Sequence, residues 1–161
     1  MSIETAQCLG GADLSWQGDY GQFYLIDQGD TAFLPPVDPA LMGPQRLVVQ
    51  PAGLVVYTGG CLQQIIRIAI YDTEPDHEPV EWRSDRPWDK VQTVDLRFPS
   101  QAFTISSPSH PSPQPYGPLF LLGAEQVKAR VAWMEFPDGR DDSVPIEPDV
   151  FSITIWWDKS S

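Results

Sequence analysis

Prolines and glycines interrupt this chain so often that it has little room for long helices. There are 17 prolines and 12 glycines among the 161 residues, which is 18% of the chain. Average proteins contain about 12% of these two residues together. Proline lacks the amide proton that a helix interior needs, and glycine loses more backbone entropy there than any other residue. The sequence therefore excludes a helical bundle and a coiled coil.

Between these breaks, apolar side chains recur with a period of two, which is typical of β-strands. We expect about nine short strands and little helix. The clearest of them are Tyr20–Asp27, Arg46–Gln50, Leu54–Tyr57, Gln64–Tyr71, Val91–Phe98, Ala102–Ser106, Gln126–Phe136 and Val150–Trp157. The segment Gln126–Phe136 begins with good helix formers, but its period-two pattern persists to its end and favours a strand.

The alternation within these strands predicts which side chains are buried. In Gln64–Tyr71, we assign Ile66, Ile68 and Ile70 to the core because that face is uniformly apolar. In Val91–Phe98, polar and apolar residues alternate, which predicts a sheet with one solvent-exposed face. Residues 51–53, Pro-Ala-Gly, predict a hairpin with a three-residue loop.

Strands that follow one another without intervening helices suggest an antiparallel β-sandwich of the jelly-roll type. A length of 161 residues suits one domain, so we expect residues 1–161 to form a single β-sandwich. Two segments are too rich in proline for regular structure, namely the predicted loops at residues 28–45 and 107–118.

The charge and the cysteines limit the partners and the compartment. The chain has 10 basic and 22 acidic residues, a net charge of −12, which argues against nucleic acid as a partner. The start of the chain lacks the pattern of a signal peptide, and no apolar stretch approaches the ~20 residues that span a bilayer. We therefore expect a cytoplasmic protein without a membrane partner. In that compartment Cys8 and Cys61 are expected to be free thiols, with a disulfide between them as the alternative.

No segment has the spacing of a known catalytic or metal-binding motif. Asp76, His77 and Glu78 are adjacent, but no second histidine-bearing segment supplies further ligands, so a solvated loop is the better interpretation. The acidic stretch Asp138–Asp142 lacks the spacing of an EF-hand loop. We expect no metal, no cofactor and no catalytic residue, although 22 acids leave a carboxylate pair for glycoside hydrolysis open.

Two kinds of residue are candidates for contact with a partner. Tryptophan and arginine, which are enriched in binding hot spots, occur together in residues 81–89, where they could also form cation–π pairs that fix the loop. Acidic loops could attract a basic partner. The partner-binding candidates are Asp76, Glu78, Trp82, Arg83, Trp88, Asp138, Asp141 and Asp142. Of the adjacent Trp156 and Trp157, one is expected in the core and the other partly exposed.

The order of several segments resembles the competence-associated nuclease inhibitors of the ComJ type and similar short bacterial β-sandwich proteins. The segments that carry the resemblance cover about half of the chain: Tyr20–Asp27, Trp88–Phe98 followed by Phe103–Ser107, and Lys128–Trp133 followed by Phe151–Trp156. The stretches at residues 35–44 and 107–118 are longer than this family needs, and no inhibitory residue can be carried over. The resemblance implies a small β-sandwich that binds another protein, such as a nuclease or a toxin.

Together these observations lead to one main hypothesis and two alternatives. The main hypothesis is a non-catalytic, acidic protein-binding domain that acts as an inhibitor or immunity-like protein on a basic partner. The first alternative is a β-sandwich that binds a small molecule or a carbohydrate by stacking on exposed tryptophans. The second is an enzyme that uses a pair of carboxylates.

Overall fold

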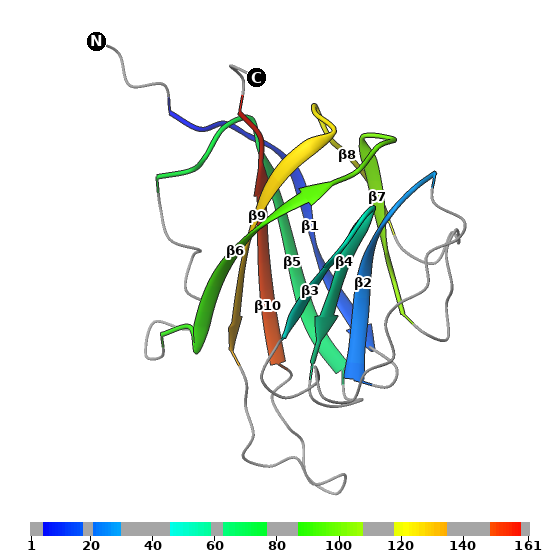
Figure 1. The fold of residues 1–161 in the computed structure, drawn as a ribbon. Coiled ribbons are helices and arrows are strands. Elements are labelled where there is room, and N and C mark those ends of the chain that lie inside the picture. Colours follow the sequence, from blue (N-terminus) through cyan, green and yellow to red (C-terminus); the bar gives the residue numbers. More distant parts are fainter. Residues whose placement is uncertain are drawn as a thin grey trace, which may run out of the picture. The chain divides into compact units, whose positions relative to one another are not determined.

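A computed structural model describes residues 5–17, 21–29, 46–58, 63–76, 87–107, 118–134 and 149–158. These residues form ten β-strands and no helix (Figure 1). The strands are β1 (Cys8–Gln17), β2 (Gln22–Asp27), β3 (Leu47–Gln50), β4 (Gly53–Tyr57), β5 (Gln63–Tyr71), β6 (Lys90–Arg97), β7 (Ala102–Ser106), β8 (Leu119–Leu121), β9 (Gln126–Met134) and β10 (Asp149–Trp156).

The strands form two five-stranded sheets. Sheet 1 has the order β1-β5-β10-β9-β6, and sheet 2 has the order β3-β4-β2-β7-β8. Contacts between Cα atoms group the chain into two compact units, one around most of sheet 1 and the other around sheet 2. The predicted all-β fold class of the sandwich type is confirmed, whereas the prediction of a single domain stays a prediction.

Two details of the predicted fold are wrong, and two strands were not predicted. The described residues form ten strands, close to the nine expected, and β1 and β8 are not among the strands predicted by range. The pairing is not antiparallel throughout, since β10 pairs with β5 in parallel. The hairpin between β3 and β4 has a two-residue loop, because Gly53 already pairs with Gln50 as part of β4.

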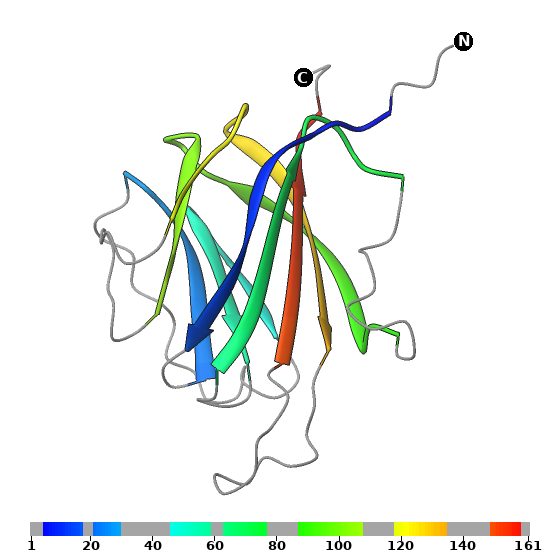
Figure 2. The same ribbon diagram turned by 180° about the vertical axis from the view of Figure 1, so that it is seen from behind.

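Strands β5, β10 and β9 lie side by side in sheet 1 (Figure 2). Their register places apolar side chains in aligned rows on the core face. By register, Ile66, Phe151 and Trp133 form one row, and Ile68, Ile153 and Val131 form the next. All six of these side chains are buried. The predicted core face of β5 is therefore confirmed, and the strand chosen over a helix for β9 is confirmed as well.

The inner strands of sheet 2 are buried on both faces. Every residue of β2, β4 and β7 is buried, and one cluster joins Tyr24, Ile26, Val55 and Tyr57 with the half-buried Val48. Phe103 and Ile105 are among the buried residues of β7, and the alternation predicted for β6 is confirmed. Strands buried on both faces have near-continuous apolar sequences, which explains the Leu-Val-Val-Tyr run of β4.

The edge strand β1 forms because a glycine lets it approach β5 closely. A Cβ atom added to Gly11 would lie 2.1 Å from the carbonyl oxygen of Ile68. One ion pair also joins β1 to β5, and one hydrogen bond joins the residue before β1 to the residue after β5. The Nε atom of Arg67 lies 3.1 Å from Oδ1 of Asp13, and the amide of Gln7 donates to Asp72 Oδ1 at 2.8 Å. Gly10 and Gly11 give the segment a low β-propensity, so the local sequence did not indicate a strand.

Candidate partner-binding surface

The structure describes two of the eight predicted partner-binding residues, Asp76 and Trp88. The other six lie outside the described residues: Glu78, Trp82, Arg83, Asp138, Asp141 and Asp142. Cys61 lies outside them too, and Cys8 is an exposed free thiol. The roles predicted for these side chains stay predictions.

Trp88 contributes to the packing of sheet 1. Its half-buried side chain packs against Met134 and Val150, together with Ile65. The next residue fixes the chain to the sheet, since the amide of Asp89 donates to the carbonyl oxygen of Trp133 at 2.9 Å. Of the two interpretations for this segment, the described contacts of Trp88 favour the one in which it holds the chain in place.

Four carboxylates gather at one end of sheet 1. Because β5 and β10 are parallel, the residues that follow them leave the sheet at the same end (Figure 1). Asp72, Glu74 and Asp76 follow β5, and Asp158 follows β10. We call these four residues the acidic end of sheet 1. Glu74 and Asp76 are exposed, as is Asp158, so this end of the sheet presents negative charge to solvent.

An arginine on β9 holds the chain segment at the acidic end in place. The Nη2 atom of Arg130 lies 3.2 Å from Oε1 of Glu74, and its guanidinium lies 5.0 Å from the ring centroid of Trp156. Glu74 is mostly exposed, so the ion pair contributes at most about 1 kcal/mol and serves mainly to orient the segment.

The two adjacent tryptophans at the end of β10 differ in burial. Trp156 is buried and Trp157 is half-buried, which confirms the prediction of one core and one partly exposed side chain.

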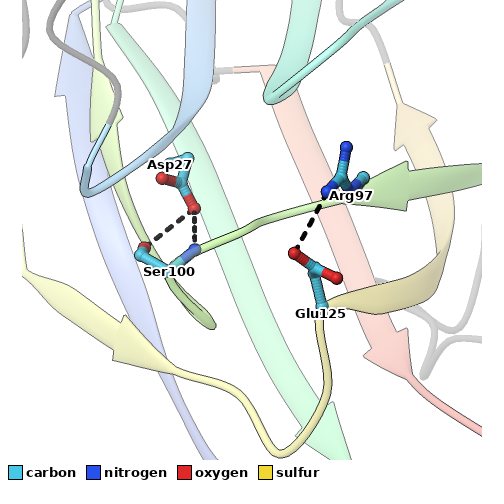
Figure 3. A network of polar contacts seen from close by, with 4 residues as sticks. All are labelled: Asp27, Arg97, Ser100 and Glu125. Atoms are coloured by element: carbon cyan, nitrogen blue, oxygen red, sulfur yellow. Dashed lines mark hydrogen bonds and ion pairs between the residues drawn. The ribbon is translucent and has the colours of Figure 1, made fainter.

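A second polar network lies in the unit of sheet 2 (Figure 3). The carboxylate of Asp27, which is buried, accepts hydrogen bonds from the amide and the hydroxyl of Ser100 at 2.9 and 2.8 Å. It also accepts one from the amide of Gly29 at 2.9 Å. Close by, Arg97 and Glu125 form an ion pair of 3.2 Å. Three donors satisfy the Asp27 carboxylate, and they join the end of β2 to the turn between β6 and β7, which is a structural role.

That turn contains a residue in a strained backbone conformation. Gln101 has φ +57°, in the left-handed region, and both of its backbone polar groups are used. Its amide donates to Phe98 and its carbonyl oxygen accepts from Leu122, at 2.8 and 2.9 Å. For a residue with a Cβ atom, this conformation costs roughly 1–2 kcal/mol.

Replacing Gln101 by glycine is therefore expected to stabilise the protein by about 0.5–1 kcal/mol, since glycine adopts this conformation without strain but loses more entropy on folding. Urea unfolding measures the change. Thr93→Gly is the matched control, because Thr93 is also exposed but lies within β6, where glycine should destabilise. A loss of stability in Gln101→Gly, equal to that of the control, contradicts the prediction.

Among the described residues, the exposed large apolar side chains all lie on edge strands. They are Leu9 on β1, Val49 on β3, Val91 on β6, and Leu119 and Leu121 on β8. An edge strand presents backbone groups that another chain can pair with. Apolar side chains at such edges are suited to contact with a protein partner.

Within the described ranges, no group of three or more His, Cys, Asp or Glu side chains is arranged to hold a metal ion. In the same part of the chain, no helix is long and apolar enough to cross a membrane.

The fold is similar to that of two proteins of known structure. One is ComJ from Bacillus subtilis, an inhibitor of the DNA-degrading activity of NucA. It matches with a TM-score of 0.62 and 11% identity, over 95% of this chain and 98% of that one. The other is the product of crocagin biosynthetic gene J, with a TM-score of 0.56 and 16% identity, over 93% and 98% of the two chains. No protein-family model matches the chain, and no curated protein matches its sequence. The resemblance to ComJ-type proteins is thus confirmed at the level of the fold.

Proposed function

We propose that this protein is a non-catalytic inhibitor that binds a basic protein partner, such as a nuclease or a toxin. The observation that carries the proposal is the likeness to ComJ, a nuclease inhibitor, over 95% of this chain and 98% of ComJ. The likeness extends over nearly the whole of both aligned chains.

The charge of the chain supports a basic partner. The described residues hold ten acidic and six basic side chains, a net charge of −4. The remaining segments hold twelve acidic and four basic residues, a net charge of −8, which completes the total of −12. Negative charge attracts a basic protein over a distance and raises the rate of encounter. Of the described surface, we assign the first contact to the acidic end of sheet 1.

The described tryptophans give less support to carbohydrate binding. Trp133 and Trp156 are buried, and Trp16, Trp88 and Trp157 are half-buried. A sugar-stacking platform needs an open ring face, so the burial of these rings favours the inhibitor hypothesis.

The proposal predicts a salt-sensitive complex with a basic protein. The tagged chain should retain such a protein from its own cells at about 0.1 M salt and lose it near 1 M, since the screening length falls from ~10 to ~3 Å. If the retained protein is a nuclease, the purified chain should suppress its cleavage of DNA. Retention of no basic protein at either salt concentration, or an enzymatic activity of the chain alone on that partner, contradicts the proposal.

A pair of double variants tests the acidic end of sheet 1. Asp76→Asn with Asp158→Asn removes two charges there, and Asp89→Asn with Asp95→Asn removes two charges from β6 and the residue before it. The first pair should slow association with the captured partner severalfold more than the second. Equal effects would mean that the net charge acts as a whole and that the acidic end has no special role.

A further inference from the structure

We propose that the open edge of β8 receives an extended segment of the protein partner as an additional strand of sheet 2. This inference rests on the proposed function and names the place where the partner is held after the first encounter.

The backbone of β8 points its free hydrogen-bonding groups outward at Leu119 and Leu121. Strand β8 pairs antiparallel with β7, with Phe120 opposite Phe103. The amide of Leu122 donates to Gln101, its opposite residue, at 2.9 Å. Bonded pairs alternate with unbonded pairs in an antiparallel ladder, so Phe120 bonds to β7. The amides and carbonyls of Leu119 and Leu121 then face away from β7, where no described strand follows.

The side chains of β8 also alternate, between a buried face and an exposed face. Phe120 is buried, and its ring stacks on Phe103 with 5.0 Å between the centroids. Phe103 stacks in turn on Phe98 at the same distance. Leu119 and Leu121 are 48% and 70% exposed. The strand is therefore anchored through Phe120, and it offers two leucines together with four backbone groups to an incoming strand.

The other three edges are less suited to strand addition. Charged side chains protect β6 (Lys90, Asp95 and Arg97) and β1 (Asp13), and such charges oppose pairing with a further chain. Strand β3 exposes one large apolar side chain, that of Val49. Pro51 directly follows the last residue of this strand. From Pro118 to Ala124, in contrast, there is no charged residue.

The charge of the chain identifies the occupant. A second copy also has a net charge of −12, so two copies repel each other. A three-residue strand with two leucines also buries much less than the ~800 Å² per partner of a stable interface. We therefore assign the edge to the basic partner, through an extended segment with aliphatic side chains at alternate positions and lysine or arginine beside them. Main-chain hydrogen bonds supply affinity in this mode, and alternate side chains supply specificity.

A designed peptide tests the edge without knowledge of the partner. The probe is an acetylated Lys-Lys-Val-Thr-Val-Thr-Val-Lys-Lys peptide, titrated into the ¹⁵N-labelled full chain and followed by NMR. The amides of Leu119 and Leu121 should exchange rapidly in the free protein, since they face solvent, and should become protected when the peptide binds. The same peptide with methylated backbone nitrogens should lose binding.

Two variants separate strand addition from simple charge attraction. Leu121→Glu adds a negative charge, so attraction alone predicts tighter binding of the basic peptide. Strand addition predicts binding weaker by about tenfold or more, because the leucine contact is lost and the edge carries a charge. Val49→Glu is the matched control, since Val49 is 48% exposed on the opposite edge of the same sheet. This variant should bind the peptide with the affinity of the wild type.

Three results would overturn the inference. They are an absence of shifts at Leu119 and Leu121 at millimolar peptide, tighter binding by Leu121→Glu, and concentration-dependent shifts without peptide, which would identify a second copy as the occupant. Capture of the basic partner tests the proposed function independently of the peptide experiment. If Leu121→Glu retains that partner with wild-type affinity, the inhibitor hypothesis stands and the β8 edge is not the binding site.

Discussion

Replacing Ile68 by aspartate is expected to abolish the cooperative unfolding transition of the protein. Ile68 is 3% exposed on β5, in the row that it forms with Ile153 and Val131. Truncation of a buried isoleucine alone costs about 2–5 kcal/mol, and an unpaired buried carboxylate adds several more. The total stability of a domain is typically only about 5–15 kcal/mol. Far-ultraviolet circular dichroism during a thermal scan measures the loss.

The control for this experiment places the same charge at an exposed position. Val49→Asp changes an aliphatic residue of an edge strand, where the carboxylate stays in water and only β-propensity is lost, about 1 kcal/mol. This variant should melt cooperatively within a few degrees of the wild type. If Ile68→Asp melts in the same way, Ile68 is not in the core and the assigned face of β5 is wrong.

Replacing Gly11 by alanine is expected to detach β1 from sheet 1 or to shift β5, at a cost of roughly 2–4 kcal/mol. The new methyl group would lie 2.1 Å from the carbonyl oxygen of Ile68 and 3.1 Å from Cα of Ala69. Both are backbone atoms in a central strand, so they cannot move aside as a flexible side chain can. The backbone at Gly11, with φ +157°, also disfavours any residue with a Cβ atom. We expect the amides of β1 to lose protection in hydrogen exchange.

Gly10 is an adjacent control for this prediction. A Cβ atom at Gly10 would meet no atom within 4 Å, so Gly10→Ala has no steric cost. It should leave stability unchanged or raise it slightly, because alanine has less freedom than glycine in the unfolded chain. Equal destabilisation by the two variants would show that flexibility at this glycine pair matters, and that close approach of β1 to β5 does not.

The strands with strong period-two patterns could be predicted, and the two short or glycine-containing strands could not. Alternation identified β5 and its core face, and it identified β9 as a strand against its helix-forming residues. Strand β8 has three residues, too few for any period to be seen. Strand β1 depends on Gly11 and on the Asp13–Arg67 ion pair, contacts between residues far apart in the chain.

Part of the candidate binding surface could likewise be predicted from the sequence, and part of it could not. The acidic residues after β5, including Asp76, could be located from the sequence, because the charge of each residue follows from its type. The sequence did not indicate that Asp158 lies at the same end, since this follows from the parallel pairing of β5 with β10. It also did not indicate the β8 edge, because Leu119 and Leu121 look like ordinary core residues until the exposed fraction of each is known.

The sequence by itself determined the all-β class, the core face of β5, the alternation of β6 and the excess of negative charge. These properties depend on local backbone preferences, on the alternation of side chains along a strand and on a count of ionisable groups. Only the tertiary structure decided which strands are neighbours, which of them lie at the edges and which apolar side chains remain in water. Pairing partners are selected by contacts between residues distant in sequence, and no period or composition within one segment contains that information.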